Sequence, residues 1–106
     1  MDFESLAARL EIDAEYFLEL VDLFITTSRS DMDKIQKGMD DQNPLDASAA
    51  AHSIKGAAGN MGFDEMAGLA QKMELQGKQG SLEGFAAYLS ELERCLTGIE
   101  NQLPGN

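Results

Sequence analysis

Apolar side chains recur every three or four residues through most of this 106-residue chain, the spacing that places them on one face of an α-helix. The longest such run predicts a helix from Asp13 to about residue 41. No segment alternates between apolar and polar residues over a useful length, so the sequence predicts no β-strand. The chain is therefore expected to be all-α. The long apolar face consists of Phe17, Val21, Phe24, Ile25, Ser28, Met32, Ile35 and Met39.

Capping residues set the limits of the first predicted helices. A short amphipathic helix over residues 2–10 has Asp2 as its cap, and Asp13 caps the long helix that follows. Asn43 and Pro44 then form a stop and a restart, because Asn is a good N-cap and Pro is well tolerated at the first helical position.

Glycines mark the later boundaries. The third predicted helix covers residues 44–61 and ends at Gly62, which can adopt the left-handed conformation of a helix terminus. A fourth helix follows at once from Phe63, and the glycine-containing run at residues 76–80 is predicted to break it. Ser81 is predicted to cap the last helix. The apolar positions of that helix are Leu82, Phe85, Ala86, Leu89, Leu92, Leu96, Ile99 and Leu103.

Four long helices with short connections predict an antiparallel up-down four-helix bundle. The short extra helix at the N-terminus is expected to cover one end of its core. A chain of this length is expected to form a single domain over residues 1–106.

The charge balance narrows the classes of partner. With 19 acidic and 8 basic residues the formal net charge is −11, which disfavours nucleic acid and anionic membrane surfaces. No apolar run approaches the roughly 18 residues of a membrane span, and the first residues lack the pattern of a signal peptide. The single cysteine, Cys95, allows no disulfide within the chain. We therefore expect a cytoplasmic protein that binds neither nucleic acid nor membranes.

His52 is the only histidine, and the third predicted helix places it in mid-helix. At 100° per residue, small and polar residues share its side of the helix, and an apolar stripe lies on the other side. A glycine inside a helix costs about 1 kcal/mol relative to alanine. Two glycines beside the imidazole therefore suggest a surface that a flat partner approaches. The residues on this side are Ser48, Ala49, Lys55, Gly56 and Gly59.

The chemistry expected of His52 is nucleophilic. A metal site lacks a second histidine, a cysteine pair or ligands at a recognised spacing, and a catalytic triad would need a nucleophile and a pocket that a bundle does not suggest. A neutral imidazole can instead attack a phosphoryl group itself. Lys55, three residues further on, could stabilise the roughly two negative charges that a phosphoryl group brings.

The fourth predicted helix is expected to orient the imidazole. Counted from the turn at Gly62, His52 and Glu74 lie nearly level with each other. A carboxylate there could accept a hydrogen bond from one ring nitrogen, fix the tautomer and make the other nitrogen more nucleophilic. A solvated acidic face is the alternative for Glu74, and a solvated surface is the simpler explanation of Gln71 and Lys78 on the same flank. The docking surface for a partner is assigned to Ser48, Ala49, Gly59, Gln71 and Lys78.

Two segments carry a family resemblance. The run from Ala51 to Phe63 reads AHSIKGAAGNMGF, which resembles the signature of histidine-containing phosphotransfer (HPt) domains, especially the domain at the start of chemotaxis-type histidine kinases. The later segment from Leu69 to Glu74 is similar to the segment that ends in Glu in those domains. The two motifs lie within residues 51–74, about a quarter of the chain, and the helix pattern agrees with the family over nearly all of it.

The resemblance implies a phosphocarrier in a two-component phosphorelay rather than an enzyme. His52 matches the phosphorylated histidine, Lys55 the cation near the phosphoryl group, Gly56 the glycine that gives access, and Glu74 the carboxylate that binds the imidazole. The implied partners are a histidine kinase and the aspartate-bearing receiver domains of response regulators. The implied cofactor is none in this chain, with Mg²⁺ brought by the receiver. A monomer is expected, since transfer through one bundle needs no dimer.

Two alternative functions and one question about the length of the protein stay open. A non-catalytic helical adaptor would bind a partner through an exposed apolar patch. A small metal-binding bundle would purify with stoichiometric metal. A chemotaxis-type kinase would continue beyond Asn106 into further domains, so the sequence fits either a free-standing phosphotransfer protein or an excised domain.

Overall fold

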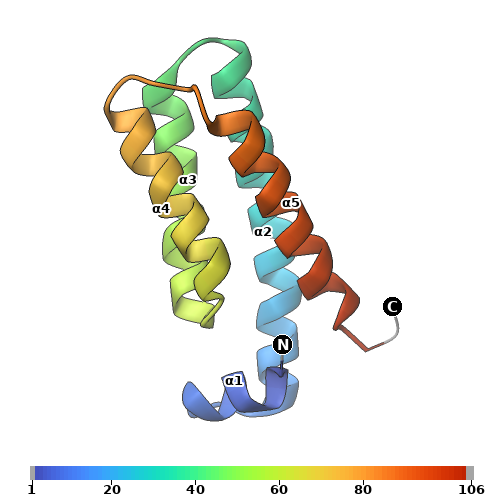
Figure 1. Cartoon of the computed structure of the whole chain (residues 1–106). Helices are drawn as coiled ribbons and strands as arrows, with labels where there is room; N and C mark the ends of the chain where they lie inside the picture. The colour runs from blue at the N-terminus through green and yellow to red at the C-terminus, as the bar shows by residue number, and fades with distance from the viewer. Residues whose placement is uncertain (1, 105–106) are drawn as a thin grey trace.

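The computed structural model describes residues 2–104, which form five helices and no strand (Figure 1). The all-α prediction is confirmed. No helix in this part of the chain is long and apolar enough to cross a membrane. The helices are α1 (Phe3–Arg9), α2 (Ala14–Asp40), α3 (Pro44–Met61), α4 (Asp64–Lys78) and α5 (Phe85–Asn101).

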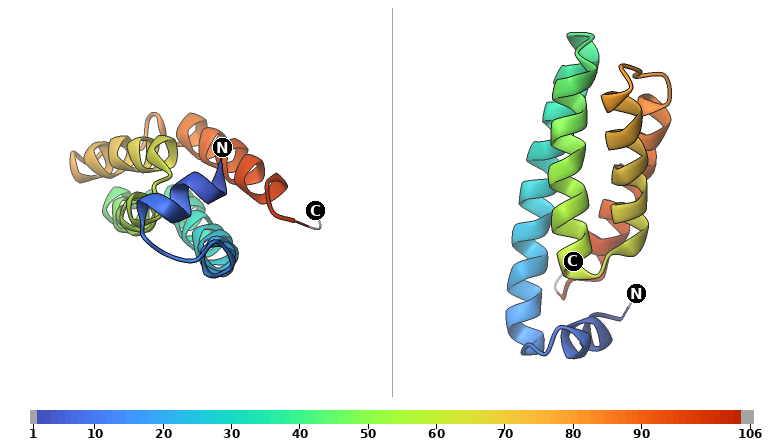
Figure 2. Two further views of the ribbon diagram at one scale, coloured as in Figure 1. Left: turned by 90° about the horizontal axis from the view of Figure 1, so that it is seen from below. Right: turned by 90° about the vertical axis from the view of Figure 1, so that its left-hand side faces the viewer.

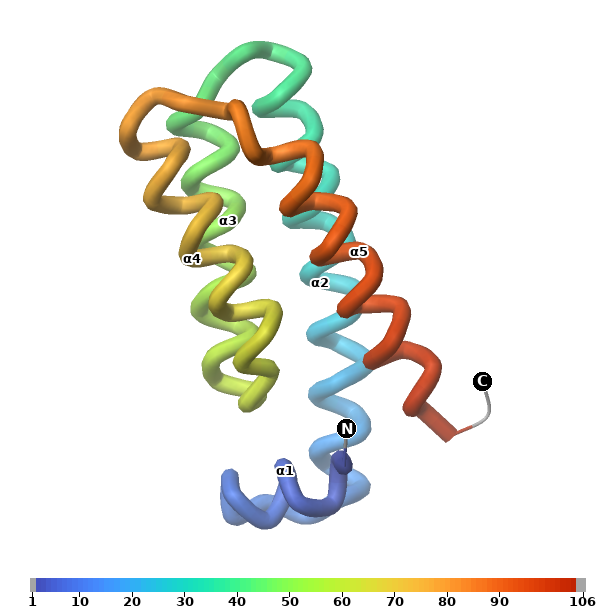
Figure 3. The backbone as a smooth tube through the Cα atoms, viewed as in Figure 1, coloured from blue at the N-terminus to red at the C-terminus, as the bar shows by residue number. Residues whose placement is uncertain are grey.

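The four longer helices lie side by side in an elongated molecule of 41 × 24 × 17 Å (Figures 1 and 3). Helix α3 packs most extensively, against α4 on one side and α2 on the other, and α5 contacts both α4 and α2. The short helix α1 lies across the end of the molecule where α2 begins and where α3 turns into α4 (Figure 2). Helix α1 therefore does not cover the face formed by α3 and α4.

Local capping explains the helix limits that the sequence predicts. The Asp2 carboxylate accepts hydrogen bonds from the backbone N–H groups of Glu4 and Ser5, and Asp13 caps α2 in the same way. Asn43 caps α3, and Pro44 occupies its first turn. Gly62 ends α3 with φ of 81°, a left-handed conformation that glycine adopts without strain.

The predicted break at residues 76–80 is wrong in position, because α4 continues through Gly77 to Lys78. A Cβ atom at Gly77 would lie 2.7 Å from the Ser48 Cβ and 2.8 Å from the Pro44 carbonyl oxygen. The glycine therefore serves a close approach of α4 to α3 inside a continuous helix. Only at Gly80, with φ of 83°, does the chain turn away.

The start of the last helix is also corrected. Ser81 accepts a hydrogen bond from the Glu83 backbone N–H and so caps a turn, whereas α5 begins later, at Phe85. Gly84 precedes the helix without a side-chain cap, and its N–H donates to the Gln76 side-chain oxygen instead. A contact with α4 thus fixes the connection to α5, and this contact cannot be predicted from the residues of the connection alone.

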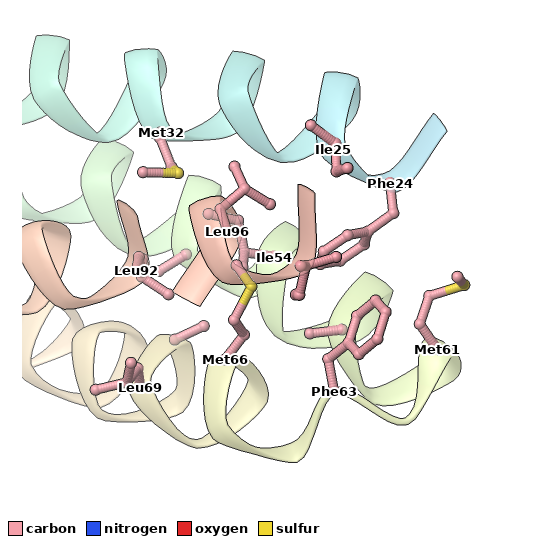
Figure 4. Packing of buried hydrophobic residues seen from close by; sticks show 14 of the residues in the cluster. Phe24, Ile25, Met32, Ile54, Met61, Phe63, Met66, Leu69, Leu92 and Leu96 are labelled. Carbon is pink, nitrogen blue, oxygen red and sulfur yellow. The ribbon is translucent and has the colours of Figure 1, made fainter. Parts of the chain in front are cut away.

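The core lies between the helices (Figure 4). Phe24 of α2, Ile54 of α3, Met66 of α4 and Leu96 of α5 are all buried in one cluster. Where α3 turns into α4, the ring of Phe63 lies 5.1 Å from that of Phe24, measured between centroids. The buried side of α3 fixes which of its residues face solvent.

Candidate functional site

His52 stands on the solvent side of α3. Its side chain is 64% exposed, whereas Ala51 and Ile54 on the opposite side of the helix are fully buried. One face of the helix is therefore buried and consists mainly of alanines, and the other face is exposed to solvent. The apolar stripe of alanines packs against the neighbouring helices, so the side of α3 that carries His52 remains in solvent.

The glycines near His52 have no packing role in this structure. A Cβ atom at Gly56 or Gly59 would meet nothing within 4 Å. Both glycines are exposed, as is Ala49. Because these residues are small, the surface around the imidazole is flat. No contact within residues 2–104 requires a glycine at position 56 or 59.

Ser48 corrects the predicted docking surface. Its side chain is buried, and its hydroxyl donates a 2.9 Å hydrogen bond to the backbone carbonyl of Glu74. The prediction that Ser48 faces a partner is wrong, because α4 approaches α3 so closely at Gly77 that Ser48 lies between the two helices. Ser48 instead joins α3 to α4 directly beside the site.

Glu74 is the buried centre of the site. Its side chain is only 4% exposed, yet both carboxylate oxygens bind basic groups. The Oε2 atom lies 2.7 Å from the His52 Nδ1 atom and 3.2 Å from the Lys78 Nζ atom. The Oε1 atom lies 2.6 Å from the Lys55 Nζ atom. The fourth helix thus supplies the carboxylate that the sequence placed level with the imidazole.

The surroundings of Glu74 keep it ionised. The hydrogen bond from Lys55 is the largest cause that lowers the pKa of the Glu74 carboxyl, to about 2, while burial acts in the opposite direction. Hydrogen bonds from Lys78 and His52 lower the pKa further. Glu74 is therefore a carboxylate throughout the neutral range.

An ionised carboxylate determines which nitrogen of His52 carries the proton. A carboxylate only accepts hydrogen bonds, so the Nδ1 atom facing Glu74 must be the donor. In the neutral ring the Nε2 atom then holds the free lone pair. In its neutral form the exposed imidazole therefore has its lone pair on the outer nitrogen, where it can act as a nucleophile.

The remaining predicted residues lie on the flank of α4. Gln71 is exposed one turn before Glu74. Lys78 is an ion-pair partner of Glu74 rather than a merely solvated residue, a contact that the sequence interpretation missed. The spacing of four residues between Glu74 and Lys78 is the signal that could have revealed it, because such pairs meet on one helix face.

Residues 2–104 contain no group of three or more His, Cys, Asp or Glu side chains placed to hold a metal ion.

Comparison with protein families gives one match: the model described as Hpt domain covers residues 19–105, which include His52, Lys55 and Glu74. Neither the curated proteins nor the solved structures gave a match.

Proposed function

The chain belongs to the Hpt domain family, the phosphotransfer domains of two-component signalling, and from this premise we propose that His52 is its phosphoacceptor. Domains of this family are phosphocarriers rather than enzymes. The observation that carries the proposal is the buried Glu74 carboxylate on the Nδ1 side of an exposed imidazole. It leaves the Nε2 atom free to meet a phosphoryl donor.

The proposed step is an in-line attack of the Nε2 lone pair on phosphorus. In one direction the donor is a receiver acyl phosphate: the Nε2–P bond forms, the P–O bond to the receiver aspartate breaks, and the aspartate leaves as a carboxylate. The ring retains its Nδ1 proton and becomes a phosphorylated imidazolium. Glu74 stabilises the positive charge that develops on the ring, because it already accepts the Nδ1–H bond.

Two further residues have roles in this proposal. Lys55 supplies a cation close to the phosphoryl group, three residues along the same helix. Gly56 gives access, since its missing side chain leaves open space beside His52. Ala49, Gly59 and Gln71 would form the surrounding docking surface, all three being exposed.

The proposed partners are a histidine kinase and an aspartate-bearing receiver domain of a response regulator. The receiver would supply the Mg²⁺ ion that neutralises the phosphoryl oxygens, so this chain would need no cofactor of its own. We further propose that the protein acts as a monomer in the cytoplasm. Support for these points comes from the family and from the single exposed histidine.

The same premise supports a finer description of the fold. Helices α2 to α5 would form the antiparallel up-down four-helix bundle, and α1 would be the short extra helix at one end. The single domain proposed over residues 1–106 extends at both ends beyond residues 2–104, which the structure describes.

The deciding experiment mixes the purified protein with a panel of phosphorylated receiver domains and kinases. Wild type should acquire an acid-labile, base-stable phosphoryl group that mass spectrometry maps to His52. The His52→Gln variant should acquire none, and Ser53→Ala, its exposed neighbour on α3, serves as the control that keeps full labelling. Labelling of His52→Gln would disprove the assignment. Partner binding without any labelling of wild type would instead favour an adaptor.

A further inference from the structure

Two lysines bind one buried carboxylate, and they reach it from different helices. Lys55 extends from α3 to the Glu74 Oε1 atom, at 2.6 Å. Lys78 extends from α4, one turn beyond Glu74 itself, to the Oε2 atom at 3.2 Å. One ammonium would suffice to neutralise Glu74. The second therefore needs an explanation.

Counting charges suggests one. With a neutral imidazole, Glu74 and the two lysines together carry one excess positive charge, in a chain whose formal net charge is −11. Phosphorylation adds roughly two negative charges on the phosphoryl group and leaves a protonated ring. The phosphorylated site is then neutral when both lysines are present. It carries a negative charge when one lysine is missing.

The two lysines differ in what they can reach. Lys55 shares a helix and a helix side with His52, so a phosphoryl group on the imidazole would compete with Glu74 for its ammonium. If Lys55 turned to the phosphoryl group, Glu74 would lose its shorter ion pair. Without Lys78, the phosphorylated imidazolium at Nδ1 would be the one cationic group left on Glu74 among residues 2–104, and it binds only the Oε2 atom.

We propose that Lys78 is a positioning residue that takes over Glu74 when Lys55 turns to the phosphoryl group on His52, an inference that rests on the proposed function. Lys78 keeps the carboxylate in place against the ring, and Lys55 is thereby released to the incoming negative charge. In the unphosphorylated protein either lysine alone satisfies Glu74. In the phosphorylated protein both are required.

The packing of α4 supports this role. Gly77 lets α4 approach Ser48 and the Pro44 carbonyl group, and the Ser48 hydroxyl binds the Glu74 backbone carbonyl. These contacts fix the part of α4 that carries both Glu74 and Lys78. Lys78 reaches Glu74 from within α4, so its ion pair requires no contact with Lys55.

The test compares Lys78→Met, Lys78→Arg and Lys72→Met in phosphoryl exchange with one receiver domain, chosen from a panel because it exchanges phosphate with wild type. Lys72 is the matched control, an exposed lysine of α4 for which no hydrogen bond or ion pair occurs within residues 2–104. The quantity measured is the equilibrium ratio of phosphorylated His52 to phosphorylated receiver. Lys78→Met should lower this ratio about two- to fivefold, the effect of a partly exposed ion pair. Lys78→Arg and Lys72→Met should leave it close to wild type.

A double-mutant cycle separates this role from other roles of Lys78. In a Lys55→Met background no ammonium leaves Glu74 on phosphorylation, so adding Lys78→Met should change the equilibrium ratio little. A direct contact of Lys78 with the phosphoryl group would make the two effects add. A docking role would change the exchange rate and leave the equilibrium ratio unaltered.

Two results would overturn the inference while leaving the proposed function intact: a Lys78→Met ratio equal to that of Lys72→Met, or additive effects in the cycle. Failure of the proposed function is recognised separately, because wild type would then take no phosphoryl group on His52. Nitrogen NMR of unphosphorylated Lys78→Met should still show the proton on the Nδ1 atom, since Lys55 continues to hold Glu74.

Discussion

Glu74 couples the site to the stability of the protein. Its carboxylate is buried and binds three basic groups from two helices. A group with these contacts stabilises the folded state only while it is ionised. The pH dependence of unfolding therefore reports on the same contacts that orient His52.

We predict that the difference in unfolding free energy between wild type and Glu74→Gln depends on pH. The pKa of the Glu74 carboxyl falls from 4.5 to about 2 on folding, so its stabilisation is complete above about pH 4.5 and disappears as the pH drops towards 2. The difference should reach about 2 to 3 kcal/mol near neutral pH. Urea unfolding over this pH range measures it.

The control for this prediction is Glu91→Gln. Glu91 is an exposed carboxylate of α5 without a hydrogen bond or ion pair within residues 2–104, so its replacement should shift stability little at any pH. A pH-independent difference for Glu74→Gln would show that packing, and not charge, accounts for its contribution.

Gly56 offers a test of access to His52. Because a Cβ atom there meets nothing within 4 Å, Gly56→Ala should raise the unfolding free energy by up to about 1 kcal/mol through helix propensity. Under the proposed function it should also slow phosphoryl exchange by about tenfold or more, since the added methyl group displaces the partner. Thermal unfolding and exchange kinetics measure the two effects.

Gly98→Ala is the comparison for Gly56. Its Cβ position in α5 is equally open, so it should stabilise the protein without slowing exchange. Equal exchange rates for the two variants would remove the access role from Gly56.

The contact of α3 with α4 determines how the residues of the site line up. The prediction concerns Gly77→Ala, whose new methyl group would lie 2.7 Å from the Ser48 Cβ and 2.8 Å from a backbone oxygen. The helices must separate to accept it, which should cost about 1 to 3 kcal/mol of stability. Urea unfolding measures the loss.

Gly68→Ala tests whether the loss belongs to this contact. Gly68 lies in the same helix, but a Cβ atom there meets nothing within 4 Å. It should therefore leave the stability unchanged or increase it. A comparable loss in both variants would mean that α4 needs glycine for a reason other than its approach to α3.

The net charge of the protein acts against folding. Few ion pairs between helices within residues 2–104 oppose the formal charge of −11, and those of Arg29 with Glu93 and Glu100 are about 40 to 50% exposed. Exposed pairs of this kind contribute little. Repulsion among the acidic side chains should therefore dominate the response to salt.

We predict that the melting temperature rises when sodium chloride increases from about 10 mM to about 150 mM, because the Debye length shrinks from about 30 Å to about 8 Å. Calorimetry at the two concentrations measures it. A fall in melting temperature would show that attractive pairs outweigh the repulsion.

The sequence predicts what local signals control. Helix number, the caps at Asp13 and Asn43 and the turn at Gly62 follow from residue preferences within a few positions. Gly77 looks like a helix breaker in isolation, and only its contact with Ser48 makes it an interior residue. The same contact buries Ser48, which helix periodicity alone places on the exposed side of α3.

The candidate site divides along the same line. His52 and Lys55 are recognisable from one helix, because spacing alone places them on one side. The contact of Glu74 with His52 depends on how two helices meet, and counting from Gly62 located it only approximately. The burial of Glu74, and with it the demand for two lysines, is a tertiary property that helix periodicity does not report.

All the residues of the ion-paired site lie on one hairpin, within residues 52–78 of α3 and α4. Helices α2 and α5 give this hairpin an apolar platform and contribute none of the groups bound to Glu74. The hairpin of α3 and α4 thus contains every group that binds Glu74 within residues 2–104. Grafted onto another helical pair that buries its alanine face, it should carry the oriented imidazole with it.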